Sequence, residues 1–314
     1  MLENTSTPGK AVLFFLTRLF ILGGMVLFFS TVSYLVGVYV CKLLFGFDFI
    51  ANPNLLNEYE TNPYVLNALK VLQVIVSIGA MLIPAWLFPK AIEQQRNSFL
   101  QLTAKPKPLF WLAAALFIVV NIPLISWLVD INAQFKLPES MAALEAQLKA
   151  TEEVANRMTK AFISGNTIND FLINLFVVAL VPAIAEELLF RGALQRFITF
   201  CFGNAHAAIL SAAIIFSAFH GQVYGFLPRM VLGVLLGYIF AYSGSIWPAM
   251  LVHFMNNAIS VLITHYKLDQ TEWAIFDESY HFPVYAIVLS IVACVSLVYL
   301  MHRNQQQQPF EHGA

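Results

Sequence analysis

DFLINLFVVALVPAIAEELLFR, residues 170–191, is the stretch that decides the fold of this chain. It begins as an apolar run long enough to enter a lipid bilayer and ends with Glu186, Glu187 and Arg191. An ionisable side chain in hydrocarbon costs roughly several kcal/mol unless it is paired or faces a wet cavity. Two neighbouring carboxylates also repel each other. The pair therefore needs partners from other parts of the chain, and those partners indicate the function.

The composition is that of an integral membrane protein. Of the 314 residues, 59% are hydrophobic and only 11% are charged, whereas soluble domains carry about 25% charged residues. No block of basic residues is present, so we expect no nucleic-acid partner. Cys41, Cys201 and Cys294 lie far apart without a CxxC pattern, so neither a disulfide framework nor a thiolate metal site is expected.

The hydropathy pattern predicts an all-α fold, a polytopic membrane bundle of about eight transmembrane helices. A span needs about 20 apolar residues, and a segment in lipid must satisfy its own backbone hydrogen bonds. The predicted spans are 17–44, 65–88, 109–129, 170–190, 206–222, 227–243, 245–265 and 282–302. The first run continues past the length of a signal peptide, so we interpret it as a retained span.

Positive charge in the short loops predicts the orientation in the membrane. The 89–108 loop carries Lys90, Arg96, Lys105 and Lys107, whereas the 46–64 loop has acidic residues and no Lys or Arg. Since Lys and Arg accumulate in cytoplasmic loops, we expect both termini in the cytoplasm. The expected location is the cell (inner) membrane, and the lipid bilayer is the expected surrounding.

The chain divides into four regions: N-terminal spans at 1–130, a connecting segment at 131–169, a core at 170–265, and a last span with a polar tail at 266–314. The connecting segment is the only long polar insert. Its apolar side chains recur at helical spacing: Met141, Leu144, Leu148, Met158 and Phe162. This pattern predicts an amphipathic helix that lies on the membrane or against the protein as a lid, or else binds a partner.

Glu186, Glu187 and Arg191 divide into two sets by helical geometry. Glu187 and Arg191 are four residues apart and share a face, so an ion pair between them is expected. Glu186 points about a quarter-turn away and stays free to face the bundle. The alternative is that all three mark a helix end, where long side chains reach water.

Three further polar residues lie in apolar helices: His220, His253 and Asn257. Phe216 precedes His220 by four residues, and Asn257 follows His253 by four. Each could be a boundary residue or an interhelical hydrogen-bonding group. Together with the two glutamates, however, these side chains can satisfy their hydrogen bonds around one water-filled cavity, which costs less free energy than burying each one separately. Such a set could activate a water for attack on a carbonyl, or bind a divalent metal with an open position.

These motifs resemble the CPBP family, the CAAX-protease and bacteriocin-processing intramembrane proteases also called the Abi family. Glu-Glu-x-x-x-Arg at 186–191, Phe-x-x-x-His at 216–220 and His-x-x-x-Asn at 253–257 occur in that family's order and approximate separation. The resemblance covers roughly 170–265. It implies hydrolysis of a peptide bond in a membrane-associated protein or peptide.

The resemblance also implies roles for the site residues. Glu186 would activate water, Glu187 with Arg191 would form a structural pair, and His220 would help to bind the water or a metal. His253 and Asn257 would stabilise the oxyanion or complete a metal site. Members of the family are commonly labelled metalloproteases, so zinc held by Glu186, His220 and His253 is the alternative to a metal-free site.

Two other functions fit parts of the pattern: a proton- or ion-coupled transporter, and a non-catalytic membrane scaffold or immunity-type protein. The depth of His220 in the membrane decides how the fourth and fifth helices must be arranged. With the fourth span ending near Phe190, His220 would lie roughly 22 Å from the glutamates along the helix axis. A shared site therefore requires the fourth helix to continue to about Phe202, or the fifth to be offset or broken.

Overall fold

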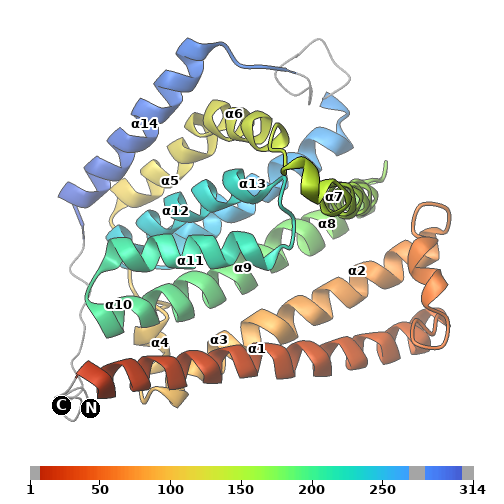
Figure 1. Ribbon diagram of the computed structural model, residues 1–314, viewed down its shortest axis with the longest axis horizontal. Coiled ribbons are helices and arrows are strands. Elements are labelled where there is room, and N and C mark those ends of the chain that lie inside the picture. The colour runs from red at the N-terminus through yellow and green to blue at the C-terminus, as the bar shows by residue number, and fades with distance from the viewer. Residues whose placement is uncertain (1–7, 269–279, 306–314) are drawn as a thin grey trace.

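The computed structural model describes residues 8–268 and 280–305, and its regular structure in these ranges is entirely helical (Figure 1). The predicted all-α membrane fold is confirmed. The α-helices are α1 Pro8–Phe45, α2 Pro63–Ser77, α3 Ile83–Ala91, α4 Arg96–Phe99, α5 Pro108–Val120, α6 Ile122–Ala133, α7 Ala142–Ile163, α8 Ile168–Asn174, α9 Val181–Glu187, α10 Arg196–Phe202, α11 Ala205–Phe219, α12 Phe226–Ser243, α13 Trp247–His265 and α14 Val284–Arg303. Three π-helical segments, η3 Ile78–Leu82, η5 Leu175–Leu180 and η6 Leu188–Gln195, and two 3₁₀ turns, η2 Pro53–Asn57 and η4 Glu139–Met141, complete the described order.

The site helix is the continuous run of α8, η5, α9, η6 and α10, 35 residues from Ile168 to Phe202. It begins at a capping box in which Thr167 and Asp170 bond each other's backbone N–H groups. It ends where Gly203 adopts φ +66, a conformation that glycine accepts without strain. The fourth helix therefore continues to Phe202, which is the first of the two alternatives left by the sequence. Glu186 and Glu187 consequently lie near the middle of this helix.

Fewer helices qualify as membrane spans than the eight predicted. Among the described residues, five helices are long and apolar enough, and a sixth span is the pair α5–α6, which is bent by 46° at Asn121. Both remaining predicted spans do form helices. α11 has only 15 residues, and α13 carries His253, Asn256 and Asn257, which lower its hydropathy.

Burial differs strongly between the outer and inner helices. In the most apolar 18-residue window of α1, 6% of residues are buried, compared with 50% in the site helix. The main hydrophobic core is formed by the site helix with α5, α11, α12 and α13. A second cluster joins α1 to α2, and Met158 and Phe162 of α7 pack against it. The site helix is therefore the enclosed centre of the bundle, and α1 has a largely apolar outer surface.

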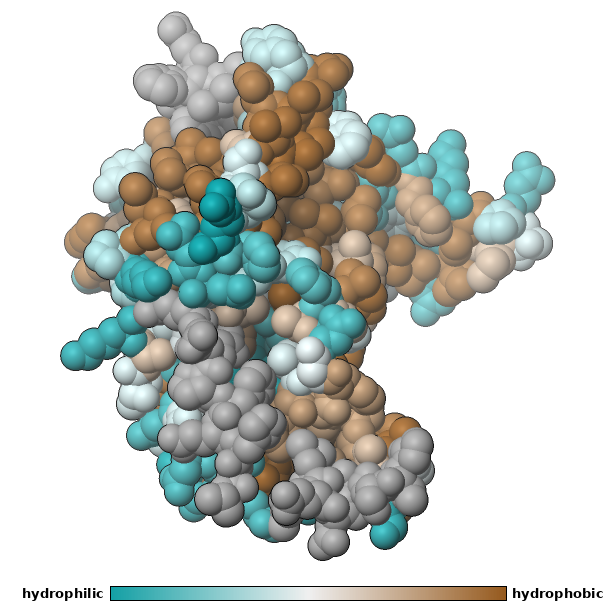
Figure 2. All heavy atoms as spheres, turned by 90° about the vertical axis from the view of Figure 1, so that its left-hand side faces the viewer, coloured by the Kyte–Doolittle hydropathy of each residue, from teal (hydrophilic) through white to brown (hydrophobic). Residues whose placement is uncertain are grey.

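Polar residues gather at the ends of the bundle. Figure 2 looks at the end where α1 begins and α14 ends, and hydrophilic side chains gather there while hydrophobic ones cover the flanks. Lys107 Nζ donates to Asn304 O at 3.4 Å across this end. α7 lies at the opposite end of the bundle (Figure 1). The predicted amphipathic helix is thus present. Met141 and Leu144 at its start are exposed, whereas Glu152 accepts hydrogen bonds from Gln222 and Tyr224, and Met158 and Phe162 pack against the second cluster.

Parts of the predicted 266–314 region lie outside the described residues. These are 269–279, which belong to the acidic loop, and 306–314, which belong to the polar tail. α14 occupies most of the last predicted span, 282–302. Cys41, Cys201 and Cys294 are all free thiols.

Candidate active site

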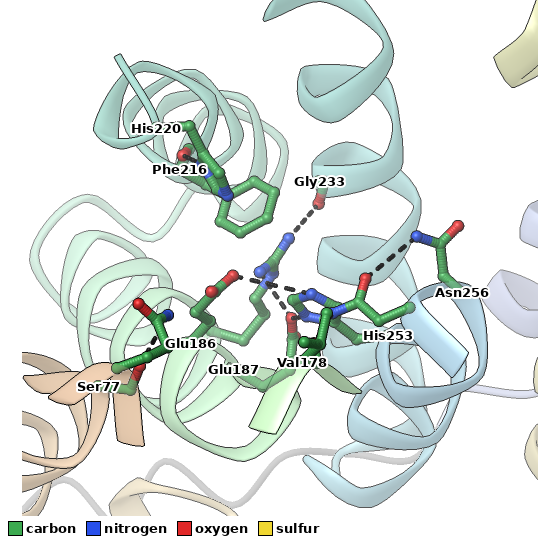
Figure 3. Close-up of polar contacts among 12 residues, drawn as sticks. Ser77, Val178, Glu186, Glu187, Phe216, His220, Gly233, His253 and Asn256 are labelled. Atoms are coloured by element: carbon green, nitrogen blue, oxygen red, sulfur yellow. Dashed lines mark hydrogen bonds and ion pairs between the residues drawn. The ribbon is translucent and has the colours of Figure 1, made fainter. Parts of the chain in front are cut away.

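The polar residues singled out in the sequence come from three segments that meet inside the bundle (Figure 3). Glu186 and Glu187 end α9, and Arg191 follows one turn later in η6. His220 caps the C-terminal end of α11. His253 and Asn257 lie one turn apart in α13. Figure 3 shows Glu186, Glu187 and His253 pointing toward one another, with His220 and Phe216 on the neighbouring helix.

Glu187 binds two partners through one carboxylate oxygen. Its Oε1 accepts from Arg191 Nη1 at 2.7 Å and from His253 Nδ1 at 2.8 Å. Glu187 is 0% exposed and Arg191 is 1% exposed, so both charges are removed from solvent and need each other. The sequence predicted the pair with Arg191. It did not predict that the same carboxylate would also hold His253.

The bond to Glu187 fixes the orientation and the tautomer of His253. A carboxylate accepts hydrogen bonds, so His253 Nδ1 must carry the proton in this contact. The other nitrogen, Nε2, lies 3.7 Å from Glu186 Oε2. This distance is too long for a direct hydrogen bond and suits a bridging water. The Glu186 side chain is 13% exposed, so the space beside it is accessible.

Phe216 joins the two histidines and the arginine. Its ring centroid lies 5.1 Å from that of His220 and 5.9 Å from that of His253, both edge to face. The guanidinium carbon of Arg191 lies 4.6 Å from the same ring. His220 Nδ1 donates to Phe216 O at 2.9 Å, which leaves Nε2 of a neutral His220 as an acceptor. The Phe-x-x-x-His spacing predicted that Phe216 and His220 share a helix face. It could not predict their contacts to α9, η6 and α13.

The backbone carbonyls of Gly233 and Gly237 in α12 accept hydrogen bonds from side chains of the site helix. Arg191 Nη2 donates to Gly233 O at 3.1 Å, and Gln195 Nε2 donates to Gly237 O at 3.0 Å. A Cβ at Gly237 would meet Gln195 Oε1 and Ile209 Cγ2, each at 2.8 Å. Only glycine permits this approach of the backbone. The sequence signal for this packing is G-x-x-x-G at 233–237, a pattern typical of closely packed helices in membranes. The predictions from the sequence did not include it.

Asn257 takes part less directly than the other residues. Its Nδ2 donates to Val178 O at 3.4 Å, and its Oδ1 accepts from Asn256 Nδ2 at 3.4 Å. The bond to Val178 holds α13 against η5. In this conformation Asn257 therefore braces the site helix, and its expected role at the oxyanion remains a prediction.

The predicted metal donors do not form a metal centre as they are placed. Among the described residues, no three His, Cys, Asp or Glu side chains are grouped so that they could hold a metal ion. Glu186 and His253 approach to 3.7 Å, and the bond from His220 Nδ1 to a backbone carbonyl leaves its Nε2 free. Zinc held by Glu186, His220 and His253 therefore stays a prediction beside a metal-free site that holds a water.

Two carboxylates and two histidines lie inside this helical membrane bundle. Residues 168–259 match the family model described as Rce1-like, type II CAAX prenyl endopeptidase. Through this segment the chain is similar to the CPBP family of CAAX proteases, the family that the sequence motifs resemble. All six predicted site residues fall inside the matched range. Neither a curated protein nor a solved structure matches the chain significantly.

This similarity supports an intramembrane endopeptidase of the CAAX type as the general activity. The match covers less than a third of the chain. α1, α2 and α7 lie outside it. What these helices add must be inferred from the structure.

Proposed function

We propose that this protein hydrolyses a peptide bond of a membrane-associated protein or peptide by means of a water molecule that Glu186 activates. The observation that carries the proposal is the position of His253. One ring nitrogen is fixed by buried Glu187 at 2.8 Å, and the other faces Glu186 Oε2 at 3.7 Å. A carboxylate and an oriented imidazole on two sides of a water-sized space are the elements of general acid–base hydrolysis.

The reaction begins with proton transfer. Glu186 takes one proton from the water, and the water oxygen attacks the carbonyl carbon of the substrate. His220 Nε2 accepts a hydrogen bond from the water and orients it. When His253 carries its second proton, it donates from Nε2 to the developing oxyanion. Preorganised donors at an oxyanion typically contribute roughly 3–4 kcal/mol to transition-state stabilisation.

Collapse of the tetrahedral intermediate completes the reaction. The C–N bond breaks, and the proton held by Glu186 passes to the leaving nitrogen. The second proton of the water stays with the new carboxyl group. Glu186 is thereby restored, so the cycle needs no other reactant. Glu187 and Arg191 contribute by holding His253 in place throughout.

The proposed location is the cell membrane, with both termini in the cytoplasm. Lys90, Arg96, Lys107 and Arg303 lie at or beyond the helix ends near the start of α1. The proximity of Lys107 to Asn304 supports placing these residues at one face. Positive charge at that face favours the cytoplasm. α7 would then lie at the extracytoplasmic face.

The test compares cleavage products in cells. A deletion strain is complemented with either the parent chain or Glu186→Gln, and new termini in the membrane proteome are mapped by mass spectrometry. We expect a set of termini that appears with the parent chain and is lost with the variant. Identical termini in the two strains would contradict the proposal and favour a scaffold or a transporter.

A further inference from the structure

His220 lies at the junction between α11 and a short loop, residues 221–225. The last turn of the helix is closed by Gly221 N, which donates to Ala218 O at 3.0 Å, and by His220 N, which donates to Ser217 O at 3.3 Å. Gly221 then adopts φ +67, so the chain turns away from the helix axis. Because helix ends fray, the position of the His220 ring depends on how firmly this loop is held.

Glu152 of α7 bonds the loop at two points. One carboxylate oxygen, Oε1, accepts from Gln222 Nε2 at 3.1 Å, and the other, Oε2, accepts from Tyr224 N at 3.3 Å. The partners are 70 and 72 residues apart in the sequence. Both oxygens of Glu152 are therefore used to hold a distant segment of the chain, the one that directly follows His220.

Gln222 is held between two opposite charges. Its side-chain oxygen accepts from Arg229 Nη1 at 3.1 Å, and its backbone oxygen accepts from Arg229 Nη2 at 2.8 Å. The amide thus presents its acceptor to the cation and its donor to Glu152, and only one orientation satisfies both. The charges of Glu152 and Arg229 also act on each other. The loop is consequently fixed between α7 and α12.

Asn132 of α6 holds the other side of the same connection. Its Nδ2 donates to Val223 O at 2.9 Å, and its Oδ1 accepts from Leu227 N at 2.7 Å. α7 differs from α6 in what else it touches, because it also contacts α2, α8 and α13 (Figure 1). α8 is the first part of the site helix that carries Glu186, and α13 carries His253. Through Glu152, the end of α11 is therefore tied to both helices that bear the other site residues.

We propose that Glu152 is a positioning residue for His220, which it keeps directed at the water that Glu186 activates. The inference rests on the proposed function, in which His220 orients that water. Glu152 acts through Gln222 and the loop, and it touches neither the water nor the substrate. α7 lies outside the segment that matches the family model, so the proposal gives this helix a part in catalysis that the match does not cover.

The first measurement separates kcat from KM. Purified full-length parent and Glu152→Ala are compared on a fluorogenic peptide that carries a cleavage site mapped in the membrane proteome. We expect kcat to fall about 10- to 100-fold with KM unchanged, since a displacement of about 1 Å in a catalytic group costs up to about 100-fold. Glu152→Gln keeps one acceptor oxygen and should give an intermediate kcat. Glu153→Ala removes the exposed neighbouring carboxylate and should match the parent.

An exchange of the two partners tests the bond between them. Gln222→Glu removes the donor and places a second carboxylate against Glu152, so kcat should fall. Combining it with Glu152→Gln restores a donor and an acceptor across the contact, and kcat should rise above that of Gln222→Glu alone. A double variant that is no more active than Gln222→Glu would overturn the inference.

A spectroscopic measurement reports on His220 without turnover. The full chain is labelled with ¹⁵N-histidine in detergent, and His220→Gln assigns the ring-nitrogen signals of His220. These signals depend on which nitrogen carries the proton and what it bonds. Glu152→Ala should shift them and leave those of His206, in the first turn of α11, unchanged. A general loss of structure would shift both histidines.

The outcomes separate this inference from the proposed function. If the parent cleaves no peptide but Glu152→Ala shifts the His220 signals alone, hydrolysis fails and positioning by Glu152 stands. If the parent cleaves and Glu152→Ala leaves the His220 signals or kcat unchanged, hydrolysis stands and the inference is overturned. A loss confined to KM would also overturn it, because α7 would then act on the substrate. If Glu152→Ala does not fold, the same criteria apply to Glu152→Gln.

Discussion

Two ion pairs in this protein have the same spacing and nearly the same length but opposite surroundings. In the site helix, Arg191 Nη1 lies 2.7 Å from Glu187 Oε1, and the side chains are 1% and 0% exposed. In α7, Lys149 Nζ lies 2.6 Å from Glu145 Oε1, and the side chains are 53% and 16% exposed. Both pairs are i,i+4. Geometry alone would treat them as equivalent.

The surroundings make the two pairs different in kind. Water screens the α7 pair, and exposed pairs of this type add little to stability. The site pair is removed from water, so each charge needs the other and loss of one leaves the second unpaired. Glu187 then binds His253 as well. The buried pair is therefore part of a site, whereas the exposed pair supports a helix at the surface.

The largest effect on folding is expected from Arg191→Met. The variant leaves Glu187 as a buried carboxylate without its cation, which should lower the free energy of unfolding by roughly 3–5 kcal/mol. Titration with SDS in mixed micelles, followed by circular dichroism, measures the change. A variant as stable as the parent would show that the buried pair is no more important than the exposed one.

His253→Ala tests whether the buried pair serves catalysis. The substitution removes the group that Glu187 orients toward Glu186. We expect the rate of peptide cleavage to fall by ~10²–10³-fold, the range for loss of one donor to the oxyanion. His206→Ala, in which a histidine bonded to Tyr238 is removed from the start of α11, is the matched control. Activity similar to that of the parent would remove His253 from the mechanism.

Gly237→Ala tests how closely α12 packs against the site helix that carries the buried ion pair. The new Cβ would meet Gln195 Oε1 and Ile209 Cγ2 at 2.8 Å, and overpacking of this kind costs roughly 1–3 kcal/mol. Gly24→Ala in α1 is the control, because a Cβ there meets nothing within 4 Å. Equal thermal unfolding midpoints for the two variants would contradict the close approach of α12.

Removal of metal should leave the activity unchanged. The proposed mechanism uses a water that Glu186 activates and His220 orients, and none of its steps requires a metal. Cleavage by purified protein is measured before and after dialysis against a chelator such as EDTA, followed by addition of zinc. Loss of activity that zinc restores would favour the alternative of a metal site built from Glu186, His220 and His253.

The smallest effect is expected from Lys149→Met in α7. The hydrogen bond from Lys149 lowers the pKa of Glu145 below its usual value, so the pair stabilises the fold above the unfolded-state pKa and loses this effect as pH falls through the lower folded pKa. The variant should weaken that acid dependence, because the backbone N–H of Leu137 still bonds Glu145, with almost no change in the unfolding midpoint at neutral pH. A large shift at neutral pH would mean that α7 is more tightly coupled to the bundle than its exposure indicates.

The sequence predicted the class of fold and the identity of the site residues more fully than it predicted how these residues are arranged. Adjacent glutamates and two histidines in apolar helices indicated a shared internal site, because each would be costly alone. The end of the site helix was left open, although Gly203 offered a stop signal. The double role of Glu187 could not be predicted, since it depends on how α13 crosses α9. Eight spans were predicted from hydropathy, whereas five or six helices among the described residues are long and apolar enough to span, because α11 is short and α13 carries polar side chains.

The most direct test of the account is the turnover of purified, reconstituted protein with Glu186 replaced by Gln. Gln keeps the shape of the side chain but cannot take a proton from water. We predict that cleavage of a membrane-embedded peptide falls by ~10²–10⁴-fold while affinity for the peptide is unchanged. Cleavage at the rate of the parent chain would contradict the central claim that Glu186 activates the attacking water.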